Sequence, residues 1–338
     1  MSDAFVSLSD LTLAYGESIA VPNLNLDIRQ GELIALLGPS GCGKTTTMRA
    51  IAGLMPAKSG TITIDGRDVT RVPANKRGIG LVFQSYALFP HLSAFENAAF
   101  GLRLQRRPEA EIRSRTQAAL EIVGLAHLAA RKPSEMSGGQ QQRLALARSL
   151  VMEPKVLLLD EPLSNLDARL RLEMRTELQR LQRETGITMV FVTHDQSEAL
   201  ALADRVVLMR DGVIEQIGPP DALYNTPVTA FAADFMGFEN IFAVEGTSLS
   251  SEQGALAVSY SADAPYLGWR PGAVRLGSGS HEARVRSVAF AGGHREYVLD
   301  TQIGPVRADV DIAAPVFSVD EAVMFDLPQE TAHPLKAS

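Results

Sequence analysis

Two patterns of hydrophobic positions follow each other along the chain and meet near residue 240. In the first, short runs of continuous apolar residues alternate with longer segments whose apolar residues recur at helical spacing. The runs occupy residues 33–37, 80–83, 156–160, 189–193 and 206–209, and the helical segments include 111–123 and 168–184. Because continuous apolar runs are typical of strands covered on both faces, this pattern predicts a layered α/β core with a largely parallel sheet.

The second pattern consists of short alternating segments separated by turn residues. The segments occupy residues 285–290, 297–301, 306–310 and 323–327, with turn signals such as Gly292-Gly293 and Gly304-Pro305. This pattern predicts a small antiparallel barrel or sandwich. We find no internal repeat and no low-complexity linker, and the 338 residues fit one copy of each domain at about 100–200 residues per domain.

Composition and charge exclude several classes of protein. The chain is 46% hydrophobic and 21% charged, which is typical of a folded globular protein and not of a disordered one. Its 32 basic and 39 acidic residues give 32 − 39 = −7, so any site for an anion must be local. The apolar runs are much shorter than the ~18 residues of a membrane span, and the first ten residues do not resemble a secretory signal. A single cysteine, Cys42, excludes a disulfide framework, and we expect the protein to work in a reducing cytosol.

A glycine-rich loop follows the first apolar run and precedes a predicted helix. The pattern G-x-x-x-x-G-K-[ST] is matched by Gly38, Pro39, Ser40, Gly41, Cys42, Gly43, Lys44 and Thr45. The glycines allow backbone N–H groups to surround a phosphate at the positive end of a helix. Lys44 is then expected to reach the β- and γ-phosphates and Thr45 to bind magnesium. A turn that only packs is the alternative, but the order of strand, loop and helix favours a nucleotide site.

Two adjacent carboxylates end another predicted strand. Asp160 and Glu161 follow the apolar run 156–159, at the end of the strand where ligands bind in open α/β sheets. We expect Asp160 to hold the magnesium shell and Glu161 to act as general base on the attacking water. Such a pair is common after strands, and its combination with the glycine-rich loop makes the assignment specific.

The sequence Ser137-Gly138-Gly139-Gln140-Gln141 resembles the signature Leu-Ser-Gly-Gly-Gln of the ATP-binding cassette family, with Met136 in place of leucine. A serine before two glycines is also a usual helix cap, but the remaining family motifs appear in sequence order. The resemblance covers residues 4–235. It implies a P-loop NTPase fold of the α/β class, with ATP and Mg²⁺ as cofactors and a helical subdomain.

The resemblance also implies roles for single residues. Tyr15 matches the aromatic residue that stacks on adenine, Gln84 matches the glutamine that contacts magnesium and the attacking water, and His194 matches the histidine that contacts the γ-phosphate. Asp167 lies in the loop that touches a second copy of the chain. Asn165 in this loop departs from the commoner alanine, so only Asp167 is carried over.

In the family, each ATP lies between the glycine-rich loop of one copy and the signature of the other, in a head-to-tail homodimer. The expected catalytic residues are Glu161, His194 and Gln84, and the expected metal ligands are Thr45, Gln84 and Asp160. The expected nucleotide-binding residues are Tyr15, Gly38, Pro39, Ser40, Gly41, Cys42, Gly43, Lys44, Thr45, Thr46, Ser137, Gly138, Gly139, Gln140 and Asp167.

Two segments and the second domain narrow the resemblance to importers. Residues 85–101 and 218–240 look like the ATPase subunits of bacterial binding-protein-dependent importers. The sequence Gly268-Trp269-Arg270-Pro271 looks like the regulatory module of that group, an oligomer-binding (TOBE) fold, although Gly272 replaces the usual glutamate. The expected domains are therefore a nucleotide-binding domain at 1–237, with a helical subdomain at about 86–155, and a small all-β, OB-like regulatory domain at 238–338.

The resemblance implies an ATPase that powers solute import as a peripheral subunit at the cytoplasmic face of the inner membrane. The expected partners are a second copy, integral-membrane permease subunits and, indirectly, an external solute-binding protein, but no nucleic acid. Polyamine or ferric iron is the favoured solute, and phosphonate, sulfate or sugar remain open. We expect Tyr86, Phe89 and His91 to contact a short helix of the permease.

Three alternatives fit the sequence less well. An exporter subunit or a soluble machine of the same family is less favoured, because the regulatory module at the C-terminal end is typical of importers. A P-loop kinase or GTPase would leave residues 137–141 and His194 unexplained, and the guanine-reading pattern Asn-Lys-x-Asp is not found. A nucleic-acid module in the small barrel is disfavoured by the acidic balance and by the lack of a basic cluster there.

Overall fold

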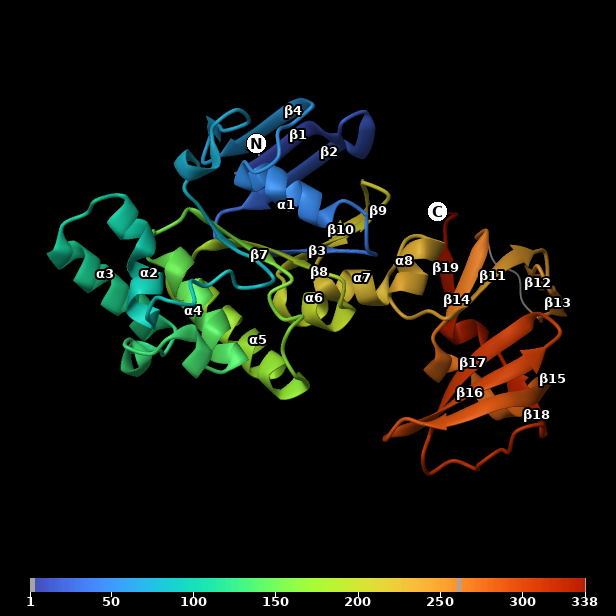
Figure 1. Cartoon of the computed structure of the whole chain (residues 1–338). Helices are drawn as coiled ribbons and strands as arrows, with labels where there is room; N and C mark the ends of the chain where they lie inside the picture. The colour runs from blue at the N-terminus through green and yellow to red at the C-terminus, as the bar shows by residue number, and fades with distance from the viewer. Residues whose placement is uncertain (1–3, 260–262, 338) are drawn as a thin grey trace. The chain divides into compact units, whose positions relative to one another are not determined.

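In the computed structural model, which describes residues 4–259 and 263–337, a six-stranded sheet forms the centre of the N-terminal part of the chain (Figure 1). Its strand order is β10-β9-β3-β8-β7-β6, and all neighbours pair in parallel except β10 and β9. The strands are β3 (Leu33–Leu37), β6 (Ile79–Val82), β7 (Val156–Asp160), β8 (Thr188–Thr193), β9 (Arg205–Arg210) and β10 (Val213–Gly218). The five predicted apolar runs are confirmed as strands.

A second, antiparallel sheet consists of two strands before β3 and two strands after α1, and the sequence pattern did not predict it. Its order is β2-β1-β4-β5, with β1 (Ala4–Tyr15), β2 (Ser18–Arg29), β4 (Ser59–Ile64) and β5 (Arg67–Asp68). The pairing of β1 with β2 shifts register between Leu8 and Leu11, so the buried leucines are not two residues apart along the whole strand. The strict alternation that marks a strand in sequence is therefore interrupted.

The helices fall into two groups. The helix α1 (Lys44–Ala52) follows β3, whereas α2 (Ala94–Leu104), α3 (Glu109–Ile122) and α4 (Gly138–Leu150) pack on one another between β6 and β7 in the chain. This second group corresponds to the expected helical subdomain. The helices α5 (Ala168–Thr185) and α6 (Gln196–Leu202) follow β7 and β8. Among the described residues, no helix combines the length and the apolar character needed to cross a membrane.

By its internal contacts the chain divides after Pro220. The short helices α7 (Pro220–Asn225) and α8 (Ala230–Phe235) lie at the start of the second unit. The expected division at residue 237 stays a prediction, and residues 1–3, 260–262 and 338 of the expected domains lie outside the described residues.

The second unit contains two antiparallel sheets, in agreement with the predicted all-β domain. One sheet has the order β13-β12-β11-β14-β19 and the other the order β17-β16-β15-β18. The strands of the first are β11 (Asn240–Glu245), β12 (Ser248–Ser251), β13 (Gly254–Ala257), β14 (Tyr266–Trp269) and β19 (His333–Leu335). Those of the second are β15 (Arg275–Phe290), β16 (His294–Thr301), β17 (Gly304–Asp311) and β18 (Ala322–Asp326).

The motif Gly268–Pro271 has a packing role inside the second unit. The Trp269 indole is buried and donates to the Pro328 carbonyl at 2.9 Å. The Arg270 guanidinium donates to the carbonyls of Met236 and Tyr224, and its carbon Cζ lies 3.7 Å from the Tyr224 ring centre. Arg270 therefore fastens the helices α7 and α8 to the start of the β domain. A side chain at Gly272, where the family has glutamate, would meet open space.

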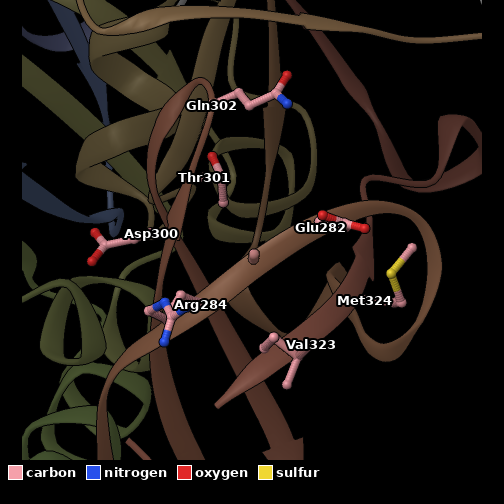
Figure 2. Close-up of a pocket in the computed structure, with 9 residues that line it drawn as sticks. Glu282, Arg284, Asp300, Thr301, Gln302, Val323 and Met324 are labelled. Atoms are coloured by element: carbon pink, nitrogen blue, oxygen red, sulfur yellow. The ribbon is translucent and has the colours of Figure 1, made fainter. Parts of the chain in front are cut away.

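An open hollow of about 580 Å³ lies on the face of β15, β16 and β18 (Figure 2). Its lining includes the charged residues Glu282, Arg284 and Asp300 together with Met324. All of these residues belong to the second unit, and none of the predicted site residues lines the hollow.

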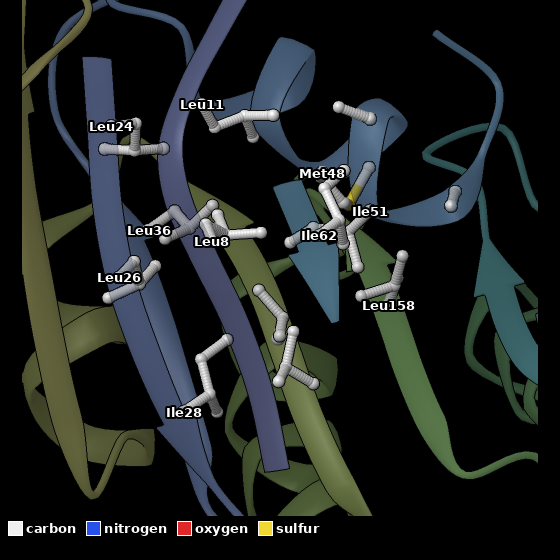
Figure 3. Close-up of a cluster of buried hydrophobic side chains, with 14 of the residues drawn as sticks. Leu8, Leu11, Leu24, Leu26, Ile28, Leu36, Met48, Ile51, Ile62 and Leu158 are labelled. Atoms are coloured by element: carbon white, nitrogen blue, oxygen red, sulfur yellow. The ribbon is translucent and has the colours of Figure 1, made fainter. Parts of the chain in front are cut away.

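Buried apolar side chains join the two sheets of the first unit (Figure 3). Leu8 and Leu26 from the antiparallel sheet meet Leu36 of β3 and Leu158 of β7 in one cluster, and Met48 of α1 also belongs to it. The helix that follows the glycine-rich loop is therefore packed between the sheets. The described part of the second unit has a core of its own around Trp269 and Tyr297.

Candidate active site

The glycine-rich loop has a backbone shape that only glycine adopts without strain. Gly38, Gly41 and Gly43 have φ angles of 147°, 85° and 100°. A Cβ atom on Gly38 would lie 2.2 Å from the Met209 carbonyl oxygen, and one on Gly43 would lie 2.7 Å from a methyl group of Val21. The loop is therefore packed closely against β2 and β9 and has the glycine-dependent backbone of a phosphate-binding loop.

Positive charge is concentrated inside this loop. The buried Lys44 ammonium donates to the carbonyls of Gly38 at 2.7 Å and Pro39 at 2.8 Å. The Cys42 thiol is also buried, 3.6 Å from the same ammonium. Together with the N-terminal end of α1, the ammonium makes the loop a site for an anion such as a phosphate group.

An exposed aromatic ring stands beside the loop. Tyr15 ends β1 with 56% of its surface exposed, and its hydroxyl lies 3.3 Å from Oγ1 of Thr46 in α1. The structure thus brings two predicted nucleotide-binding residues together, although they lie far apart in sequence. An exposed ring at this place offers a flat surface on which a base can stack.

The two expected metal ligands from α1 and β7 are in contact. The Thr45 hydroxyl donates to Oδ1 of Asp160 at 3.2 Å. Burial raises the pKa of Asp160, and the charge of Glu161 adds to this effect, while the Thr45 hydrogen bond and Arg49 oppose it. A hydroxyl and a carboxylate next to a phosphate loop fit Mg²⁺, which prefers a few protein oxygens together with phosphate oxygens.

The three predicted catalytic residues meet at one carboxylate. Nε2 of Gln84 donates to Oε2 of Glu161 at 2.9 Å, and Nδ1 of His194 lies 3.3 Å from Oε1. The three residues follow β6, β7 and β8, which are neighbours in the parallel sheet. Glu161 has a positive φ of 44°, and its N–H donates to the Val192 carbonyl, so the backbone aims the carboxylate toward its two partners.

Two residues that contact this group were not assigned from the sequence. Nε2 of Gln84 also donates to the Ser164 hydroxyl at 3.2 Å, and Nδ2 of Asn165 donates to the Gln84 carbonyl at 2.8 Å. The only signal in the sequence was the departure of Asn165 from the alanine that is common in the family. In this chain the Asn165 side chain forms a hydrogen bond with the Gln84 backbone that an alanine could not form.

The signature residues begin the helix α4. Ser137 is its N-cap: the Ser137 hydroxyl accepts from the Gln140 N–H, and the Gln140 side chain accepts from the Ser137 N–H. The cap interpretation is therefore also correct. A Cβ on Gly138 would meet Leu166 at 3.8 Å, and one on Gly139 would meet Leu170 at 3.4 Å.

The structure does not join the signature to the glycine-rich loop within one copy. Among the described residues, no hydrogen bond links residues 137–140 to residues 38–46. Asp167, from the loop next to the signature, is exposed and caps α5 by accepting from the Leu170 N–H at 2.9 Å. The exposed Ser137, Gly138 and Asp167 thus form a second polar surface.

The expected permease contacts have unequal exposure. His91 is exposed and Phe89 is half-buried against Phe100, with 4.4 Å between the ring centres. Tyr86 is only 8% exposed, and its hydroxyl is buried without a hydrogen-bond partner. The expectation that Tyr86 is a surface anchor is therefore wrong for this conformation, because its ring fills the interior of the segment.

A buried carboxylate lies behind His194. Glu198 is 4% exposed and accepts from the Thr193 hydroxyl at 2.6 Å, and Nε of Arg171 is 3.6 Å from its other oxygen. Burial raises the pKa of Glu198, and the Thr193 hydrogen bond and Arg171 oppose this shift in part. Thr193 precedes His194 directly, so this carboxylate fixes the end of β8 from which the histidine extends.

Comparison with known proteins places this geometry among ATP-binding cassettes. A family model described as "ABC transporter" matches residues 21–164. An "Fe(3+) ions import ATP-binding protein" of Agrobacterium fabrum is 47% identical over 312 residues, which cover 88% of this chain and 88% of that protein. A "Spermidine/putrescine import ATP-binding protein" of Aliivibrio fischeri is 54% identical over 241 residues, which cover 71% of this chain and 65% of that protein.

The fold is shared with solved cassettes. A dimeric ATP-binding cassette in a post-hydrolysis state, bound to ADP and Pi, is 34% identical with a TM-score of 0.56. The match covers 64% of this chain and 98% of that chain, so it concerns the first unit.

Replacing Glu161 by glutamine tests the convergence of the three catalytic residues. We expect ATP turnover to fall roughly 10²- to 10⁴-fold, because glutamine cannot accept the proton of the attacking water. Binding of ATP, measured by fluorescence of a labelled nucleotide, should change little. Glu173→Gln, at an exposed position of α5, is the matched control and should hydrolyse ATP normally. Normal turnover of Glu161→Gln would contradict its role as general base.

The raised pKa of Glu198 predicts a pH-dependent difference between the wild type and Glu198→Gln. A carboxyl group whose pKa is raised by folding stabilises the fold below its unfolded pKa of about 4.3 and loses this contribution as the pH rises through the folded value. The variant should therefore gain stability relative to the wild type as the pH rises from the unfolded pKa of about 4.3 through the raised folded value, by about 1.4 kcal/mol for each unit of raised pKa. Urea unfolding of both proteins across this range measures the difference, and a constant difference would contradict the prediction.

Proposed function

Since this chain belongs to the ABC transporter family and is an ATPase for solute import, we propose that two copies hydrolyse Mg·ATP head to tail and drive the uptake of ferric iron. The observation that carries the proposal is the meeting of Gln84, Glu161 and His194 at one carboxylate beside the phosphate loop. This arrangement provides a base and its orienting groups at the place where a γ-phosphate is expected.

The residues of one copy would divide the work as follows. Lys44 and the loop N–H groups hold the β- and γ-phosphates, and Tyr15 stacks on the base. Thr45 and Asp160, with Gln84, would hold magnesium, which neutralises phosphate charge when it is bound. Glu161 takes the proton of the attacking water, Gln84 keeps the carboxylate turned toward that water, and His194 contacts the γ-phosphate.

The second copy would supply the signature. Ser137 and Gly138 are exposed at the positive end of α4, Gly139 is buried behind them, and Asp167 is exposed in the neighbouring loop. A helix N-terminus is a suitable partner for the γ-phosphate of a nucleotide held by another copy. The dimeric state of the solved cassette with ADP and Pi supports this arrangement. ATP would favour the closed dimer, and hydrolysis would allow the dimer to open again. This closing and opening would move the membrane-spanning permease to which the dimer is joined.

Ferric iron is favoured over polyamine by the extent of the comparisons. The iron-import relative matches 88% of this chain, whereas the polyamine-import relative matches 71%. The iron-import relative thus matches more of this chain than the polyamine-import relative does. The chain would act as a peripheral subunit at the cytoplasmic face of the membrane, joined to its permease.

The substitution Ser137→Arg tests the head-to-tail site. A long cation in place of the cap should block the approach of the second copy, so we expect ATP hydrolysis to fall below about one hundredth of wild type while each copy still binds nucleotide. Ser134→Arg, three residues earlier and also exposed, is the matched control and should hydrolyse normally. Steady-state phosphate release and nucleotide titration measure the two properties. Normal hydrolysis by Ser137→Arg would show that the signature does not face an active site.

Uptake of labelled solute tests the choice of iron. A strain that lacks this chain should lose high-affinity uptake of radiolabelled ferric iron and keep uptake of spermidine. The wild-type chain should restore iron uptake, and Lys44→Ala should not, because the phosphate loop then lacks its ammonium. Loss of spermidine uptake with normal iron uptake would instead identify a polyamine importer.

A further inference from the structure

The segment between Gln84 and α2 contains two strained residues in succession. Tyr86 and Ala87 have φ angles of 60° and 49°, a left-handed conformation that is unfavourable for residues other than glycine. The Tyr86 hydroxyl is buried without a hydrogen-bond partner. Local hydrogen bonds involve only the N–H groups, which donate to the Phe83 carbonyl at 2.9 Å from Tyr86 and to the Ser85 carbonyl at 2.7 Å from Ala87. The carbonyls of the two strained residues therefore depend on donors from elsewhere.

One arginine holds both strained carbonyls. Nη1 of Arg148 donates to the Ala87 carbonyl at 2.6 Å, and Nη2 donates to the Tyr86 carbonyl at 2.9 Å. Its guanidinium carbon also lies 5.8 Å from the centre of the Phe89 ring. Arg148 is half-buried, and this burial lowers the pKa of its guanidinium. Two parallel donors of fixed geometry fit two neighbouring carbonyls as a lysine cannot.

The other end of the segment is fixed to a second helix. The buried Asn97 of α2 accepts from the Phe89 N–H at 2.8 Å and donates to the carbonyls of Phe89, Leu92 and Ser93. The segment from 86 to 93 is thus fastened at both ends to the helical subdomain, by Arg148 of α4 and by Asn97 of α2. Gln84, just before the segment, is fastened to Glu161 and Ser164 instead.

Arg148 lies on the same helix as the signature. Ser137 caps the start of α4 and Arg148 lies near its end, about three turns away along a continuous helix. A displacement of the capped end therefore moves the guanidinium with it, because a helix of this length behaves as a rigid rod. The hydrogen bonds then pass the displacement to the backbone of Tyr86 and Ala87.

We propose that Arg148 is a positioning residue that couples the signature end of α4 to the segment 86–91, which contains the expected permease contacts Phe89 and His91. The inference rests on the proposed function, in which nucleotide held by a second copy meets Ser137. Binding there shifts α4, Arg148 carries the shift to the strained carbonyls, and the exposed His91 and half-buried Phe89 move with them. Without the two hydrogen bonds from Arg148, the signature still binds nucleotide, but the segment 86–91 no longer moves when nucleotide binds.

Amide hydrogen exchange of the full-length chain, read by mass spectrometry, tests the coupling. All proteins carry Glu161→Gln so that Mg·ATP stays bound. In this parent, ATP should slow exchange roughly tenfold both in residues 137–141 and in residues 85–92, whose amides include the hydrogen-bonded N–H groups of Tyr86 and Phe89. With Arg148→Met added, the response at 137–141 should remain, and exchange at 85–92 with ATP should stay within about twofold of that without ATP.

Two further variants make the result specific. Arg148→Lys keeps the charge and the bulk but not the paired donors, so it should fold and show the same loss in weaker form. Arg115→Met removes an arginine of the same subdomain that donates to the Val151 carbonyl, and it should respond as the parent does at both places.

The outcomes separate the inference from the proposed function. If ATP protects both regions in Arg148→Met as in the parent, Arg148 does not couple them and the inference is wrong. If both responses vanish in Arg148→Met and Arg148→Lys but not in Arg115→Met, Arg148 only maintains α4, and the inference is also wrong. If ATP fails to protect residues 137–141 in the parent itself, the head-to-tail site is refuted and the coupling with it.

Discussion

The parallel pairing of β6, β7, β8 and β3 is the constraint on which the site depends. Parallel strands end at the same edge of the sheet, so the residues that follow them meet there even when they are distant in sequence. The phosphate loop follows β3, Gln84 follows β6, Glu161 follows β7 and His194 follows β8. The strands are apolar almost throughout, and their burial on both faces fixes the register that sets the spacing of these groups. The Glu161 carboxylate is then within reach of its two partners without any long flexible loop.

Much of this arrangement could be predicted from the sequence, because the signals that identify it lie in short stretches of the chain. The apolar runs and the glycine-rich loop are readable because each depends on a few consecutive residues, and the order of strands in a parallel sheet brings their ends together. The antiparallel sheet of β1 and β2 was not predicted, because a register shift between Leu8 and Leu11 breaks the alternation that identifies such strands. The burial of Tyr86 was not predicted either, because it depends on a positive φ that no local residue requires.

Several contacts that escaped prediction share one form, in which a side chain on one element donates to backbone carbonyls of another. Asn165 holds the Gln84 carbonyl, and Arg77 holds the carbonyls of Ala50 and Ile51 at the end of α1. A backbone carbonyl is present at every residue, so the acceptor leaves no mark in the sequence, and the donor looks like any other polar residue in a helix or loop. The Arg77 bonds are costly to lose, because they are buried and their donor is charged.

The catalytic residues and the signature residues differ in how they are held, and this difference bears on the proposed contact between two copies. The groups expected to polarise water are joined by hydrogen bonds within one copy, whereas Ser137 and Asp167 use their side chains to cap α4 and α5 and remain on an exposed surface. A capping side chain accepts a hydrogen bond from one of the unpaired N–H groups at the start of its helix. The other N–H groups at this positive end remain available to an anion that approaches from outside. The folding role of Ser137 and its proposed role toward a second copy are therefore compatible, because both use the same orientation of α4. In the proposed dimer, each copy would fold and bind nucleotide by itself, and the exposed signature surface of the second copy would complete the site.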